Sequence, residues 1–204
     1  MTLTDRFQEA LRAVDAGEHF LPFIGGEAAR LERCAIAAKR VFGLPDGAAI
    51  DPYVVAGSLD IPIITEASQF DAIAEPARSE MLSSREWSAG TLEGPAGPLI
   101  ILNPMHAPTR LRVTLAEEIS HLVMGHPPST IMAGARTYVG TVEAEAFSVG
   151  GALVMPYGRV FRMVKAGATI PDIAAAFAVS PAMARCRVNR TGLSRMHRKR
   201  ATTR

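Results

Sequence analysis

Residues 115–126 read LAEEISHLVMGH and combine a helical pattern of apolar side chains with a compact group of ionisable ones. The apolar side chains recur at three- and four-residue intervals: Leu111, Leu115, Ile119 and Leu122. This pattern predicts an amphipathic helix over residues 109–125, with Gly125 as its C-terminal signal. Glu118 falls at the edge of the apolar stripe, where a carboxylate is costly to bury unless it is paired or close to a cation.

Glu117 and His121 are four residues apart, so both side chains project from one face of the predicted helix and could share a metal ion. Metal-assisted peptide hydrolysis needs a Lewis acid that holds a water molecule, and a nearby carboxylate that accepts the proton of that water. Two ligands on one helical face, with Glu118 directly after the first, supply this arrangement. A third ligand must come from another part of the chain.

A second long helix is predicted over residues 137–155, and it offers Glu143 and Glu145 as that ligand. Both flank the apolar stripe of this helix, and helical geometry alone does not choose between them. His126 points about 140° away from His121 on an ideal helix, so we expect it to act at the helix end. His106, in the loop before the helix, is a less favoured candidate for the site.

The segments around these two helices predict an α+β fold that is mostly helical around a small three-stranded sheet. Residues 27–42 and 51–59 have helical patterns with clear start or stop signals. Residues 61–65 form a short strand that Pro62 confines to an edge or a start. Residues 87–93 and 98–102 flank a Gly- and Pro-containing turn and form a hairpin.

The C-terminal part of the chain has the outline of a helix-turn-helix over residues 169–189. We expect residues 158–192 to form a helical hairpin packed on a domain of residues 1–157, and residues 193–204 to form a basic disordered tail. Residues 185–204 hold eight of the 22 lysines and arginines and no acidic residue. A solvated tail is the first interpretation, and contact with nucleic acid or an acidic partner is the second.

The composition is that of an ordinary globular protein, with 204 residues, 48% hydrophobic and 21% charged. It excludes a disordered or fibrous chain. Neither a membrane-spanning run nor a secretory signal is recognisable, so we expect a soluble cytoplasmic protein. Cys34 and Cys186 lack metal-site spacing, which excludes a disulfide framework and a zinc ribbon.

Four ordered motifs resemble the ImmA/IrrE metallopeptidases. Residues 112–126 resemble the TLAHELGHLLLGH helix of that family, and residues 98–103 resemble the strand that precedes it. Residues 145–156 resemble the EANRFAAELLMP helix, and residues 172–181 resemble the ELAKRFGVSP turn. The resemblance extends over about residues 27–192.

This resemblance implies a zincin-like α+β fold and a zinc-dependent endopeptidase. Characterised members of the family cleave helix-turn-helix repressor proteins and thereby switch on stress or mobile-element genes. By position, Glu118 would be the general base and His121 a zinc ligand. Counting back from Pro156 places Glu145 at the family's carboxylate ligand, and Glu117 would complete the set.

The sequence departs from the family at Glu117, where the family has the first histidine of His-Glu-x-x-His. A carboxylate there lowers the formal charge of a zinc site by one, so bound water should be acidified less. Oxygen-rich ligation also favours manganese or iron(II). Without a metal, the neighbouring carboxylates should repel one another, and at least one should hold a proton. The alternative function is a catalytically inactive regulator that binds a protein or DNA.

Overall fold

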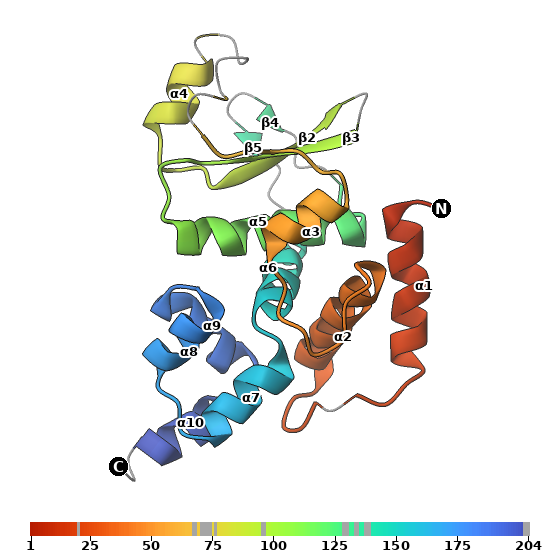
Figure 1. Ribbon diagram of the computed structural model, residues 1–204, viewed down its shortest axis with the longest axis vertical. Coiled ribbons are helices and arrows are strands. Elements are labelled where there is room, and N and C mark those ends of the chain that lie inside the picture. Colours follow the sequence, from red (N-terminus) through yellow and green to blue (C-terminus); the bar gives the residue numbers. More distant parts are fainter. Residues whose placement is uncertain are drawn as a thin grey trace.

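The computed structural model describes residues 1–19, 21–66, 69, 75, 77–94, 97–127, 131–132, 135–136 and 140–201 (Figure 1). The helices in this part of the chain are α1 (Leu3–Asp15), α2 (Gly26–Val41), α3 (Pro52–Ser58), α4 (Ala77–Ser83), α5 (Pro108–Met124), α6 (Gly140–Val154), α7 (Tyr157–Lys165), α8 (Ile170–Phe177), α9 (Pro181–Arg190) and α10 (Ser194–Ala201). The strands are β1 (Ile63–Ile64), β2 (Ala89–Gly94), β3 (Gly97–Leu102), β4 (Ile131–Met132) and β5 (Ala135–Arg136). The predicted α+β architecture is confirmed.

The three-stranded sheet has the order β1-β3-β2. Strands β2 and β3 form the expected antiparallel hairpin, in which Gly94 pairs with Gly97, and the two residues between them lie outside the described part. Strand β1 runs parallel to β3 at the edge, as Pro62 predicts, and the Pro62 carbonyl accepts a hydrogen bond from the Ile100 amide. Helix α5 runs along the sheet and packs on β2 and β3 (Figure 1). The sheet therefore supports the helix that carries the candidate site.

Helices α5 and α6 form the most extensive helix–helix contact in the described part of the chain. Leu115 and Ile119 of α5 and Leu153 of α6 are fully buried. A Cβ atom at Gly150 would lie 2.8 Å from the backbone nitrogen of Glu117, which is shorter than real Cβ contacts. The absent side chain thus lets α6 approach α5 beside the candidate site.

Gly150→Ala is expected to destabilise the protein by about 1–3 kcal/mol, because the added methyl group overpacks a backbone contact. Gly57→Ala is the matched control, since Gly57 is an exposed residue of α3 and a Cβ there would meet nothing within 4 Å. Alanine is the better helix former, so the control should be neutral or slightly stabilising. The measurement is the free energy of unfolding in denaturant, and equal values for the two variants would contradict the expectation.

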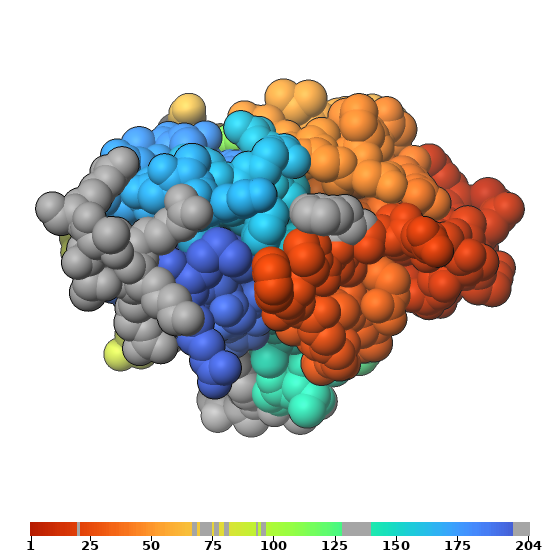
Figure 2. All heavy atoms as spheres, turned by 90° about the horizontal axis from the view of Figure 1, so that it is seen from below, coloured from red at the N-terminus to blue at the C-terminus, as the bar shows by residue number. Residues whose placement is uncertain are grey.

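Helix α1 has no counterpart in the sequence prediction. It begins with a capping box, in which the Thr2 hydroxyl accepts from the Asp5 amide and the Asp5 carboxylate accepts from the Thr2 amide. Phe7 and Val14 are buried where α1 packs on α2 and α5. The loop after α1 also contacts α7, because the Phe23 and Phe161 rings stack with centroids 6.0 Å apart. Viewed from below, the segment that follows α1 lies beside the C-terminal helices on one face (Figure 2).

Helices α8 and α9 form the helical hairpin that the sequence predicts over residues 169–189. Thr169 caps α8 and Ser180 caps α9, and Ala178 between them is left-handed, with φ 51°. Helix α9 packs on α6, so the hairpin completes the core.

Helix α10 occupies most of the segment that we expected to be a disordered tail. Leu193, directly before it, is only 1% exposed, and Met196 packs against the core. Helix α10 also contacts α7. These apolar contacts order residues 193–201 in spite of their positive charge, and residues 202–204 lie outside the described part. No helix among the described residues is both long and apolar enough to span a bilayer.

Lys39 is a buried lysine of α2, only 2% exposed, whose ammonium donates to the Asp46 carbonyl at 3.1 Å. Burial lowers the pKa of Lys39 from its ordinary value of 10.5 to about 8. Between these two pH values the unfolded chain binds more protons than the folded protein, so stability should rise with pH. Below pH 8 the folded protein instead carries a buried charge.

Lys39→Met is therefore expected to be more stable than the native protein at pH 7. The difference in stability between the two proteins should narrow as the pH rises from about 8 to 10.5. Thermal unfolding of both proteins across this pH range measures the difference in stability. Lys165→Met, at an exposed position of α7, is the control and should leave the pH profile of the native protein unchanged. A stability difference that does not change with pH would show that the Lys39 ammonium group is not buried as a charge.

Candidate metal centre

Two helices bring three possible metal ligands together: Glu117 and His121 on α5, and Glu143 in the first turn of α6. One ligand atom from each lies within 4.8 Å of the other two. The His121 Nε2 atom is 3.7 Å from the Glu143 carboxylate. All three side chains are half-buried, so the cluster is screened from bulk water on one side.

The cluster concentrates negative charge in a partly desolvated place. Burial, followed by the charges of Glu118 and Glu143, raises the pKa of Glu117 to about 7. Burial also lowers the pKa of His121, against the opposing effect of Glu143. The raised pKa favours the protonated form of Glu117 when no metal is bound, and the sequence predicts that at least one carboxyl group of the site holds a proton.

This donor set fits a divalent cation. Carboxylate oxygens and a neutral imidazole are ordinary ligands of zinc, and a set with two carboxylates also suits manganese and iron(II). A cation at the centre would offset both the burial and the neighbouring negative charges that raise the pKa of Glu117. These three residues could therefore hold a divalent cation.

Glu118 lies beside the cluster, and a hydrogen bond from the sheet holds its side chain. The Thr91 hydroxyl of β2 donates to the Glu118 Oε2 atom at 2.7 Å. Glu118 is half-buried, and its charge contributes to the raised pKa of Glu117. This carboxylate is thus oriented next to the candidate ligands without being one of them.

Glu145 points to other partners. Its Oε1 atom accepts a hydrogen bond from the Arg30 guanidinium of α2, and its Oε2 atom is 3.4 Å from His126 Nε2. Residues 143 and 145 lie about 200° apart on a helix, so their carboxylates face different partners. The structure places Glu143 beside His121 and Glu117, and it places Glu145 in an ion pair with Arg30.

His126 lies next to the cluster, which the ideal-helix angle does not predict. Its Nδ1 atom is 3.1 Å from the Nδ1 atom of His121, and the two rings meet edge to face. Helix α5 ends at Met124, and Gly125 with φ 71° turns the chain back toward the helix. The glycine C-cap was visible in the sequence and was the signal that the helical angle no longer applied to His126. His106 instead bonds to the Trp87 carbonyl and is not in the cluster.

The sequence model of the peptidase family described as IrrE N-terminal-like domain matches residues 66–189. The chain belongs to this family. The match covers the β2–β3 hairpin, both helices of the candidate centre and nearly all of α9, and it leaves α1, α2 and α3 outside. None of the curated proteins and none of the solved structures shows a significant match to the chain.

Membership of the IrrE N-terminal-like family identifies the chain as metallopeptidase-like and confirms the resemblance seen in the motifs. The cluster on α5 and α6 lies inside the matched segment, so the centre belongs to the family domain.

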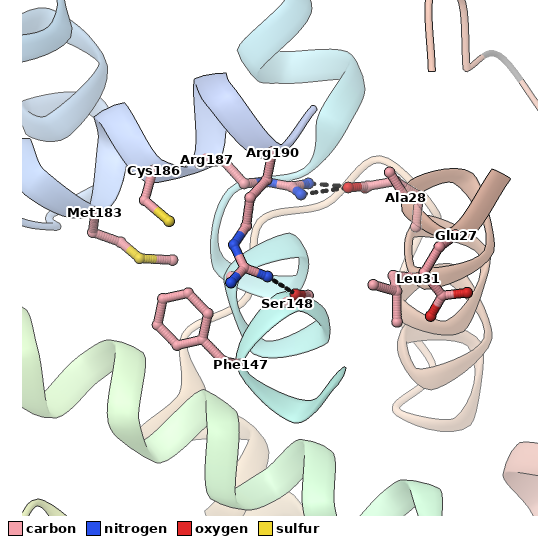
Figure 3. Close-up of a pocket in the computed structure, with 11 residues that line it drawn as sticks. Glu27, Ala28, Leu31, Phe147, Ser148, Met183, Cys186, Arg187 and Arg190 are labelled. Atoms are coloured by element: carbon pink, nitrogen blue, oxygen red, sulfur yellow. Dashed lines mark hydrogen bonds and ion pairs between the residues drawn. The ribbon is translucent and has the colours of Figure 1, made fainter. Parts of the chain in front are cut away.

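A cavity of about 260 Å³ lies away from this centre, between α2, α6 and α9 (Figure 3). Leu31, Phe147 and Met183 form its apolar walls. Arg190 donates to the Ser148 hydroxyl and lies over the Phe147 ring. None of the site residues predicted from the sequence lines this cavity, so it does not enter the proposed chemistry.

Proposed function

We propose that the protein is a metal-dependent endopeptidase, with Glu117, His121 and Glu143 as the ligands of a divalent ion and Glu118 as the general base. The observation that carries this proposal is the convergence of the three ligand atoms within 4.8 Å, beside an oriented carboxylate. Zinc is the proposed ion, with manganese or iron(II) as competitors because two of the ligands are carboxylates.

The ion, when bound, would supply Lewis-acid polarisation of the peptide carbonyl and a more acidic water molecule. The protein supplies the position of the proton acceptor. Thr91 fixes one oxygen of Glu118, so the carboxylate is held at the α5 surface next to the ligands. Glu118 accepts the proton of the attacking water and can return it to the leaving amine.

The proposed substrate is a protein, specifically a helix-turn-helix transcriptional repressor. This assignment rests on the resemblance to the ImmA/IrrE metallopeptidases, because the centre itself does not specify a sequence to be cleaved. A repressor substrate would place the protein in the cytoplasm and in stress or mobile-element regulation.

A binding-only regulator is the second candidate function, and Glu117 is the observation that favours it. A carboxylate in place of histidine lowers the charge of the centre and weakens the supply of a nucleophile. Such a protein would keep the fold and hold its partner without cutting it.

The two functions are separated by incubating the purified protein with helix-turn-helix repressors of its source organism, beginning with any encoded beside its gene. The protein is tested after chelator treatment and after reloading with zinc, manganese or iron(II), and fragments are identified by mass spectrometry. Cleavage restored by a metal supports the endopeptidase. A stable complex that remains uncut with every metal supports the regulator and contradicts the endopeptidase.

A further inference from the structure

A chain of contacts leads from the surface of α2 to the far side of His121. Arg30 bonds to Glu145 Oε1, Glu145 Oε2 is 3.4 Å from His126 Nε2, and His126 Nδ1 is 3.1 Å from His121 Nδ1. His121 Nε2 then faces Glu143 at 3.7 Å. The His126 side chain is only 10% exposed, so bulk water has little access to compete for these contacts.

The contacts favour one placement of the protons on the two histidines. Glu145 Oε1 accepts from the Arg30 guanidinium, and Glu145 Oε2 is free to accept from the Nε2 atom of His126, so this nitrogen is placed as a donor. A neutral His126 then has a bare Nδ1 atom, which can only accept. The two Nδ1 atoms are 3.1 Å apart, so in this tautomer of His126 a hydrogen bond between them needs the proton on Nδ1 of His121.

We propose that His126 and Glu145 are positioning residues that hold His121 in its Nδ1–H tautomer, with the Nε2 lone pair directed at Glu117 and Glu143. The inference rests on the proposed function, because this lone pair has a use only if His121 binds a metal. It gives Glu145 a defined role outside the ligand cluster.

The arrangement has a clear physical benefit. A histidine ligand binds a metal only through a bare nitrogen, and the partner of its other nitrogen decides which nitrogen that is. In this protein the partner of His121 is His126, which follows the end of α5. Glu145 comes from α6, and Arg30 comes from α2. Three separate elements thus fix one ring, and losing such a partner weakens metal affinity by roughly 10–100-fold in known sites.

The test compares the native protein with two variants of His126. The phenylalanine of His126→Phe cannot accept a hydrogen bond, whereas the amide of His126→Gln can accept one from His121 and donate one to Glu145. Long-range ¹H–¹⁵N NMR on the metal-free proteins reads the tautomer of His121, and competition with a chromogenic chelator reads the zinc affinity. His19→Gln is the control, since His19 bonds to the Val14 carbonyl away from the centre.

The native protein and His126→Gln should show the Nδ1–H tautomer and similar zinc affinity. His126→Phe should lose the single tautomer and bind zinc roughly 10–100-fold more weakly. Glu145→Gln, which removes the anion, is the second variant if His126→Phe does not fold, and it should shift the tautomer in the same direction.

An Nε2–H tautomer of His121 in the native protein would overturn the inference. An unchanged tautomer and zinc affinity in a folded His126→Phe or Glu145→Gln variant would do the same. If the native protein binds no zinc, the proposed function fails, whereas the tautomer of the metal-free protein still decides whether His126 orients His121.

Discussion

Glu118→Gln is expected to reduce repressor cleavage by about 10²–10⁴-fold while zinc still binds. The substitution keeps the size of the side chain, and the glutamine oxygen can still accept the hydrogen bond from Thr91. It removes the basic oxygen that takes a proton from water, so the loss should appear in kcat rather than in the binding of repressor. Rates of fragment formation and zinc titrations of the same preparation measure both effects.

Glu86→Gln is the control for this substitution, because Glu86 is exposed in the segment before β2. It should cleave at the native rate. Cleavage by Glu118→Gln within a few-fold of the control would remove Glu118 from the mechanism. Loss of zinc from Glu118→Gln would instead make this residue a ligand.

Glu32→Ala is expected to destabilise the protein by about 3–5 kcal/mol, the usual cost of removing one partner from a buried ion pair. Glu32 and Arg187 link α2 to α9, with both side chains 6% exposed and a 2.8 Å contact from Nη2 to Oε2. The substitution leaves the Arg187 charge buried, and it also removes an anion whose charge favours the ammonium form of Lys39. Denaturant unfolding measures the loss.

Replacing both partners together gives the matched comparison. Glu32→Leu with Arg187→Met removes both buried charges and should cost less than Glu32→Ala alone, because apolar side chains can fill the same space. Asp46→Ala breaks the more exposed Arg40–Asp46 pair and should cost no more than about 1 kcal/mol. A similarly small cost for Glu32→Ala would mean that the pair is solvated in solution.

Local signals were enough to predict the framework of the fold. The apolar stripe and Gly125 placed the central helix at residues 109–125, and the structure has it at Pro108–Met124. Pro62 marked the edge strand correctly. Helix α1 also carries a local signal, the Thr2 and Asp5 capping box, which the prediction did not use. Helix α10 depends on contacts with α7 and the core, and the local charge pattern does not show them.

The geometry of the candidate site was predictable where one helix determines it. The four-residue spacing of Glu117 and His121 places both on one face, and the structure brings their ligand atoms together. The choice between Glu143 and Glu145 depends on the rotation of α6 against α5. The Glu145 carboxylate binds Arg30, which is 115 positions away in the sequence. No local sequence pattern reveals that pair.

Zinc titration of the metal-free protein tests the central claim most directly, with the affinity read by competition against a chelator. We expect one zinc ion per chain, and Glu117→Gln and Glu143→Gln should each weaken binding by more than the roughly 100-fold upper range of a positioning residue. Glu145→Gln should weaken it by roughly 10–100-fold. Absence of stoichiometric binding, or loss of binding in Glu145→Gln with native affinity in Glu143→Gln, would contradict the account.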